Sequence, residues 1–217
     1  MEKRSFEVCP EGFPVIFTLG FCALFFGTIG ASFIGFLFFV LTLFSIYFFR
    51  DPPRYSTSDK GDVLSPADGK VLFVGKEKDP LEGKESLKIS IFMDLFSVHV
   101  NRAPAKGEVK EIVYKKGKFL NASLDKASKE NEQNIIQFKV GRGENFVLVQ
   151  VAGVIARRIV CWLRPKDKVE AGDKIGLIKF GSRVELYMPE NYEPVVSVGE
   201  KVLAGETIIA TKNKKRN

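Results

Sequence analysis

The chain has 217 residues, of which 45% are hydrophobic and 27% charged, and a net charge of +7. This length suits one folded domain with an appendage. Three cysteines without a CxxC pair argue against a disulfide framework or a structural zinc site. Residues 1–50 hold three basic and three acidic side chains, so the positive charge belongs to residues 51–217. A basic domain beside an apolar segment favours an anionic lipid surface as partner, and no nucleic-acid-binding motif is present.

Residues 13–49 contain no charged side chain. As one helix they would be about 55 Å long, whereas the hydrocarbon core of a bilayer is about 30 Å thick. Small residues at 27–32 interrupt the stretch and predict two short helices. Basic residues stand at both ends of it: Lys3, Arg4, Arg50 and Arg54. Because basic flanks stay in the cytoplasm, we expect a hairpin with both ends cytoplasmic, which either crosses the membrane fully or re-enters from one side.

We therefore expect the chain to divide into an N-terminal membrane hairpin, residues 1–54, and a second domain, residues 55–217, that faces the cytoplasm at the cell membrane. Beyond the hairpin, short alternating segments between Gly, Pro and Asp turns predict strands. The predicted strands are Lys70–Val74, Leu87–Phe92, Gly107–Tyr114, Ile135–Val140, Phe146–Val151, Val154–Cys161, Lys174–Phe180, Val184–Met188 and Thr207–Thr211. Only Asn121–Glu132 is predicted as a helix, so the domain is mainly β.

Two internal repeats refine this fold class. The pattern PAxGxV begins at Pro66 and again at Pro104, and the pattern VxAGxxI begins at Val169 and again at Val202. Each pattern is a turn followed by the start of a strand. The pair resembles the half-motifs of the barrel-sandwich fold of lipoyl and biotinyl domains. We therefore expect a barrel-sandwich-like domain. The resemblance says little about function, because no hairpin carries the modified lysine of those domains.

Three residues could act together as an acid–base relay on a nucleophile. Ser182 follows Gly181 between two alternating segments, and glycine allows a close approach to its own carbonyl. In isolation this pair reads as a strand bulge. The alternative is a self-processing bond, in which Ser182 Oγ attacks the preceding carbonyl. His99 is the single histidine and Asp68 lies in a turn; taken alone both read as structural, but with Ser182 they supply an imidazole, a carboxylate and a hydroxyl.

Several blocks together carry a family resemblance: the membrane stretch, SPADGKV at 65–71, VHVNRAP at 98–104, NASLDKASKENEQN at 121–134 and FGSRVEL at 180–186. In order and spacing they resemble the short phosphatidylserine decarboxylases over essentially the whole chain. The resemblance implies that the proenzyme cuts itself between Gly181 and Ser182. Residues 1–181 would become the β chain and residues 182–217 the α chain of a heterodimer.

The resemblance also implies the cofactor and the substrate. A pyruvoyl group forms covalently from Ser182, without PLP and without a metal ion. The enzyme would convert phosphatidylserine in the membrane to phosphatidylethanolamine and CO2. In this reading His99, oriented by Asp68, removes the Ser182 proton during processing and donates a proton after decarboxylation.

The chain departs from longer relatives at three places. Those relatives have a Leu-Gly-Ser-Thr cleavage site and a second histidine, about where Arg102 stands here, and Gln133 replaces an arginine that the family often shows. Whether His99 serves processing, decarboxylation or both is therefore open. Arg102 and Arg183 are predicted to bind the substrate from their charge and their proximity to the motifs; the alternative is that both are solvated arginines.

Two other functions stay open at this point. A decarboxylase of an archaeal-type serine lipid, archaetidylserine, would use the same head-group chemistry. A non-enzymatic, membrane-anchored barrel-sandwich adaptor would explain the anchor and the fold, but it would usually carry a long heptad hairpin, which is absent. The acyl-chain preference does not follow from the sequence, and a higher oligomer is left open.

Overall fold

The computed structural model describes residues 7–55, 59, 61–124, 126–141, 143–154, 158–179 and 181–213. By its internal contacts the chain forms two compact units, Met1–Pro53 and Arg54–Asn217. The boundary lies one residue before the predicted division.

The first unit is a helical hairpin. A short 3-10 helix η1 (Pro10–Gly12) leads into α1 (Phe13–Thr28), and α2 (Ser32–Phe48) follows after a three-residue turn. Gly30 has φ +81° in this turn, a left-handed conformation that glycine adopts without a steric cost. The two helices pack closely, because a Cβ at Gly35 would lie 3.0 Å from the backbone nitrogen of Gly27.

The predicted break in the apolar stretch is thus confirmed. Pro10–Thr28 is 19 residues long and apolar enough to cross a membrane, and the apolar helix Ser32–Phe48 is shorter. Nearly all side chains of α1 are exposed or half-buried, and the exposed ones include Phe17, Phe21 and Leu24. An exposed phenylalanine- and leucine-rich surface of this size needs an apolar surrounding, which supports a membrane anchor.

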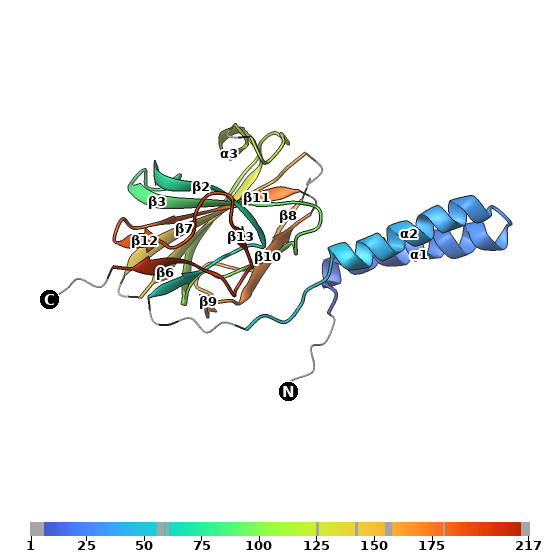
Figure 1. Ribbon diagram of the computed structural model, residues 1–217, viewed down its shortest axis with the longest axis horizontal. Helices are drawn as coiled ribbons and strands as arrows, with labels where there is room; N and C mark the ends of the chain where they lie inside the picture. The colour runs from blue at the N-terminus through green and yellow to red at the C-terminus, as the bar shows by residue number, and fades with distance from the viewer. Residues whose placement is uncertain are drawn as a thin grey trace. The chain divides into compact units, whose positions relative to one another are not determined.

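The second unit is mainly β, as predicted (Figure 1). In the described residues its largest sheet has the order β13-β2-β3-β11-β7-β6-β5-β9. Two smaller sheets have the orders β4-β10-β8 and β1-β14-β12. The strands are β1 (Asp62–Leu64), β2 (Gly69–Lys78), β3 (Glu85–Met93), β4 (Val100–Arg102), β5 (Gly107–Lys115), β6 (Gln133–Val140), β7 (Glu144–Val151), β8 (Ile159–Cys161), β9 (Lys168–Val169), β10 (Lys174–Ile178), β11 (Ser182–Met188), β12 (Tyr192–Pro194), β13 (Lys201–Val202) and β14 (Ile208–Lys212).

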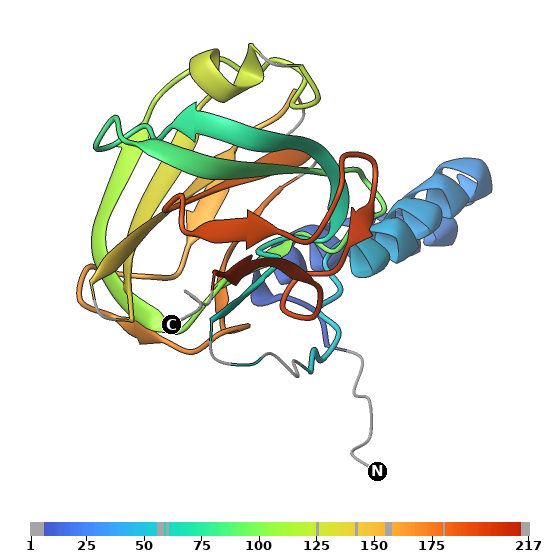
Figure 2. The ribbon, with the colours of Figure 1, turned by 60° about the vertical axis from the view of Figure 1, so that its left-hand side comes forward.

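The large sheet curls around a hydrophobic core (Figure 2). Side chains alternate between the two faces of a strand, and β11 shows this clearly. Val184, Leu186 and Met188 belong to the main core, whereas Tyr187 packs in a second cluster on the other face. Ser182 stands at the start of β11 in phase with Val184, so its side chain faces the main core.

The two repeats pair with each other around an approximate two-fold relation. Leu64 N donates to Pro104 O at 2.8 Å, and Arg102 N donates to Pro66 O at 2.9 Å. Each bond joins the residue two places before one PAxG turn to the proline of the other turn. The predicted half-motifs are therefore equivalent in space as well as in sequence.

The second pattern follows the same relation. Gly205 N donates to Ser65 O at 2.8 Å, and Gly172 N donates to Ala103 O at 2.9 Å. The Ala-Gly turn of each VxAGxxI pattern, here called the AG turn, thus donates a backbone hydrogen bond to the residue before the proline of one PAxG turn. This interlocking explains why both patterns occur twice, and it is the arrangement expected of a barrel-sandwich-like domain.

Two predicted elements are shorter than expected. The helix predicted over Asn121–Glu132 is reduced to α3 (Ala127–Glu130). Asn121 Oδ1 accepts hydrogen bonds from the backbone N and the Oγ of Ser123, and such local bonds compete with a helix. The strand predicted from Val154 begins only at Ile159; residues 155–157 lie outside the described residues, as does Phe180 at the end of another predicted strand.

Candidate active site

The Gly181–Ser182 bond lies in the connection between β10 and β11. Gly181 has φ +60°, a left-handed conformation that other residues rarely adopt. Ser182 is 0% exposed, and its Oγ has no hydrogen-bond partner among the described residues. An unpartnered buried hydroxyl is costly, and in native proteins each such group needs an explanation. Here the hydroxyl directly follows a carbonyl that it could attack.

β3 ends at Met93, and two of the three candidate residues stand at strand starts beside that end. Ser182 is the first residue of β11 and the register partner of Met93. Asp68 directly precedes β2, in which Lys70 pairs with Phe92. Both residues are therefore at the same end of neighbouring strands, on the two sides of β3.

His99 approaches the same end of β3 from the sheet β4-β10-β8. It directly precedes β4 and is 2% exposed. Two residues further on, Asn101 Nδ2 donates to Met93 Sδ at 3.4 Å. Val100 pairs with Leu177 of β10, the strand that leads to Gly181. The sheet contacts thus bring the starts of β2, β4 and β11 together around Met93.

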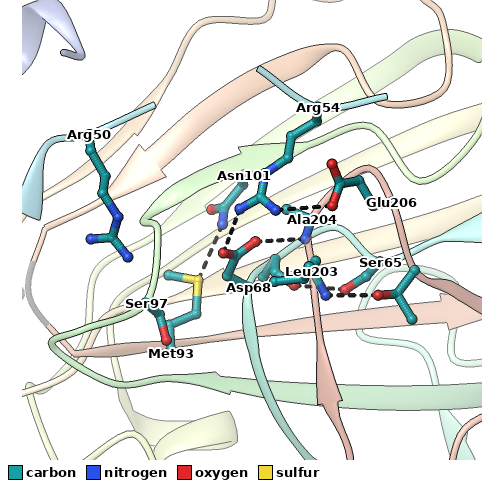
Figure 3. A network of polar contacts seen from close by, with 12 residues as sticks. Arg50, Arg54, Ser65, Asp68, Met93, Ser97, Asn101, Leu203, Ala204 and Glu206 are labelled. Atoms are coloured by element: carbon teal, nitrogen blue, oxygen red, sulfur yellow. Dashed lines mark hydrogen bonds and ion pairs between the residues drawn. The ribbon is translucent and has the colours of Figure 1, made fainter. Parts of the chain in front are cut away.

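Asp68 is held firmly by two donors. Its Oδ1 accepts from Ala204 N at 2.7 Å, and its Oδ2 accepts from Arg54 Nη2 at 2.7 Å (Figure 3). Arg54 also pairs with Glu206 at 3.2 Å. Asp68 is only 6% exposed, so this carboxylate is more than a surface turn residue.

Arg102 is not a solvated arginine, so that alternative is wrong. It is 7% exposed, and its Nη1 donates to Gly172 O at 3.0 Å. It lines a pocket of about 680 Å³ together with Arg54, Leu163, Asp167, Lys168, Val169, Ala171, Gly172, Asp173, Lys174 and Gly205. This pocket lies at the Lys174 end of β10, about 13 Å along the strand from the end that leads to Gly181. Substrate binding by Arg102 stays a prediction.

Arg183 is not solvated either, because it is 3% exposed. Its Nη1 donates to Ser128 Oγ at 2.6 Å and its Nη2 donates to Leu124 O at 3.2 Å. It also pairs with Glu185 at 3.4 Å. By the alternation along β11, Arg183 faces away from the side of Ser182. Its described contacts attach the segment around α3 to the strand that begins at Ser182, and its role toward substrate stays a prediction.

The sequence analysis missed the charges around Arg183. Lys88 Nζ lies 3.2 Å from Glu185 Oε2, and Tyr187 OH donates to the same oxygen at 2.9 Å. Burial, and then the negative charge of Glu185, raise the pKa of Tyr187 far above its usual range. The charged residues Arg183 and Glu185 within the alternating segment Ser182–Met188 were the available signal for this buried cluster.

A chain of buried amides was also missed. Asn134 Nδ2 donates to Gln150 Oε1 at 2.8 Å, and Gln150 Nε2 donates to Asn101 Oδ1 at 2.8 Å. Asn101 continues the chain to Met93. None of the three amides is more than 2% exposed, and a fully bonded buried network is rigid. It therefore fixes the end of β3 against which Ser182 lies.

Metal ligation has no obvious place in this arrangement. Over the residues that the structure describes, no group of three or more His, Cys, Asp or Glu side chains could hold a metal ion.

Removal of the Arg183 charge tests the buried cluster. Arg183→Met leaves Glu185 buried with one cation fewer, and loss of one partner of a buried ion pair costs about 3–5 kcal/mol. We expect the free energy of unfolding to fall by about 3 kcal/mol, measured by urea denaturation in detergent. The variant and its reference protein both also carry Ser182→Ala, so that neither is cut. Lys106→Met is the control, because its pair with Glu170 is exposed and contributes below about 1 kcal/mol. Equal losses in the two variants would contradict the assignment.

Comparison with known proteins agrees with the geometry. The family model described as phosphatidylserine decarboxylase matches residues 41–210. The phosphatidylserine decarboxylase proenzyme of Oleidesulfovibrio alaskensis is 46% identical over 98% of this chain and 97% of its own length. The proenzymes of the same name from Desulfotalea psychrophila and Pelagibacter ubique are 47% and 45% identical, over 96% and 98% of this chain and 98% and 100% of their own lengths. The chain therefore belongs to the phosphatidylserine decarboxylase family.

Proposed function

We propose that this chain is a self-processing, pyruvoyl-dependent enzyme that converts phosphatidylserine to phosphatidylethanolamine and CO2. The observation that carries the proposal is the buried hydroxyl of Ser182, which has no hydrogen-bond partner among the described residues and directly follows Gly181 in its left-handed conformation. The name of the relatives, phosphatidylserine decarboxylase proenzyme, supports both the substrate and the processing. Family membership gives the adaptor alternative no support.

Processing would begin with the removal of the Ser182 proton by His99. Asp68, which Ala204 and Arg54 hold in place, orients the imidazole. Ser182 Oγ then attacks the Gly181 carbonyl carbon and the amide becomes an ester. Elimination cuts the chain and leaves dehydroalanine, whose hydrolysis releases ammonia and leaves the pyruvoyl end. Residues 1–181 and 182–217 stay together as a heterodimer.

Decarboxylation would then use the same buried position. The pyruvoyl carbonyl supplies the electron sink that loss of CO2 from an amino acid requires, the part that PLP plays elsewhere. His99 is the proposed proton donor to the carbon that has lost CO2. Its burial, at 2% exposed, limits competing proton transfer from water.

The hairpin would hold the enzyme at the membrane that contains its lipid substrate. α1 and α2 are apolar, and most of their side chains are exposed or half-buried. Basic residues flank the hairpin on both sides. We therefore place the hairpin in the cell membrane and the catalytic domain on its cytoplasmic face.

The first test concerns the nucleophile. Ser182→Ala should stay one uncut chain on a denaturing gel and release no CO2 from phosphatidylserine, because it lacks both the attacking oxygen and the source of the ketone. Ser182→Cys should cut slowly, since a thiol can form a thioester in the same way. The wild-type enzyme should lose activity with borohydride or hydroxylamine.

Ser90→Ala is the matched control. Ser90 is 1% exposed and its Oγ also has no partner among the described residues, but it lies in the middle of β3. It should cut and react as the wild type does. Activity in Ser182→Ala, or activity unaffected by carbonyl reagents, would end the pyruvoyl proposal.

The second test concerns His99. No second histidine can replace it, so His99→Ala should slow cutting about 10²–10⁴-fold, the usual contribution of a general base. Cutting is followed on gels over hours and days after synthesis. A variant that cuts at the wild-type rate but releases no CO2 would limit His99 to decarboxylation. A variant unchanged in both steps would remove His99 from the mechanism.

The third test concerns topology. Epitope tags at the N-terminus and at the C-terminus should both be digested by protease in inverted membrane vesicles, and both be protected in spheroplasts. The basic flanks of the hairpin are the physical reason. Protection of one tag alone in inverted vesicles would show a single crossing and refute the hairpin topology.

A further inference from the structure

A second glycine lies directly against the carbonyl of the proposed cleavage bond. The register of β7 with β11 pairs Val151 with Arg183, and continued by two residues it puts Gly153 opposite Gly181. A Cβ built on Gly153 would lie 1.9 Å from Gly181 O and 2.9 Å from Gly181 C. Gly153 is absent from the described glycines with positive φ. The position therefore requires glycine for space and not for an unusual backbone conformation.

The backbone around Gly153 has little freedom to move away. The preceding residue, Ala152, is bound on both sides: its O accepts from Asn131 Nδ2 at 2.7 Å and its N donates to Glu132 O at 3.0 Å. Asn131 in turn bonds to both backbone groups of Leu120. A side chain at position 153 would therefore displace the Gly181 carbonyl more easily than it would displace its own backbone.

The peptide plane of Gly181 is less tightly packed than the backbone at Gly153. A Cβ at Gly181 would meet nothing within 4 Å, so no close packing at that atom sets the plane of its carbonyl. The orientation of this plane decides whether a hydroxyl on the next residue can approach the carbonyl carbon from its open face. The contact with Gly153 is made to the carbonyl oxygen itself.

We propose that Gly153 is a positioning residue for self-cleavage, whose bare Cα holds the Gly181 carbonyl in the orientation that Ser182 Oγ attacks. The inference rests on the proposed function. In the step that it serves, the bond from Ser182 Oγ to Gly181 C forms and the bond from Gly181 C to Ser182 N breaks. The proton leaves Oγ for His99 and ends on the released nitrogen.

The test is Gly153→Ala. A misplacement of about 1 Å can cost about a hundredfold in rate, so cutting should slow at least a hundredfold on a gel time course. Gly107→Ala is the matched control, because its Cβ would also press on a backbone oxygen, Lys139 O at 2.8 Å, in another part of the sheet. It should cut at the wild-type rate.

A second variant separates the carbonyl contact from neighbouring packing. A Cβ at Gly153 would also lie 3.4 Å from Ala122 Cβ. Ala122→Gly added to Gly153→Ala relieves that contact but leaves the contact with Gly181 O, so the double variant should stay slow. Restored cutting would show that packing against Ala122 is the cause, and would overturn the proposal.

Folding is measured apart from cutting. In chains that also carry Ser182→Ala, Gly153→Ala should unfold within a few degrees of its reference, and loss of the folded state there would assign Gly153 to folding and overturn the inference. Wild-type cutting in Gly153→Ala would overturn the inference alone. An uncut wild-type chain would instead overturn the proposed function together with it.

Discussion

The rest of the structure depends on one constraint: Ser182 is the first residue of β11, a central strand of the large sheet. β11 has β3 on one side and β7 on the other, and Ser182 and Arg183 are already paired at its start. The serine backbone is therefore fixed, while the residue before it lies outside the strand in a left-handed conformation. A chain cut between the two would keep β11, β12, β13 and β14 in their sheets, because β11, β13 and β14 pair with strands that precede the cut. The proposed cut would therefore leave the two resulting chains associated through their shared sheets.

The two faces of β11 have different tasks. The face of Ser182 points into the main core, where burial protects the hydroxyl of the proposed nucleophile from water. The opposite face carries Arg183 and Glu185, which pair with each other. Their other described partners come from the segment around α3, from Lys88 and from Tyr187. Buried ion pairs contribute little net stability compared with apolar packing. Their effect here is positional, since they fix the part of β11 that follows the proposed cleavage bond.

Much of the fold could be predicted because its signals are local. Alternation located the long strands, and the repeats indicated an interlocked pair of half-motifs. Strands of two or three residues, such as β9 and β13, are too short for any periodicity. The helix over Asn121–Glu132 failed because the side chain of Asn121 bonds its neighbours. At the site, Ser182, His99 and Asp68 were selected as a possible acid–base relay from their residue types, and the family motifs then connected them. The amide chain from Asn134 to Met93 joins residues distant in sequence, which no local pattern reveals.

The site breaks the approximate symmetry of the fold that carries it. Asp68 and Lys106 occupy the same position in the two PAxG turns. Asp68 is buried and bound by Ala204 of the facing AG turn and by Arg54, whereas the Lys106 side chain is 75% exposed and pairs with Glu170. The backbone bonds of the two turns are equivalent, so the fold places no demand for a carboxylate at this position. The fold alone therefore does not account for a carboxylate in one half, the half in which the starts of β2, β4 and β11 meet. In the proposed mechanism this carboxylate orients His99.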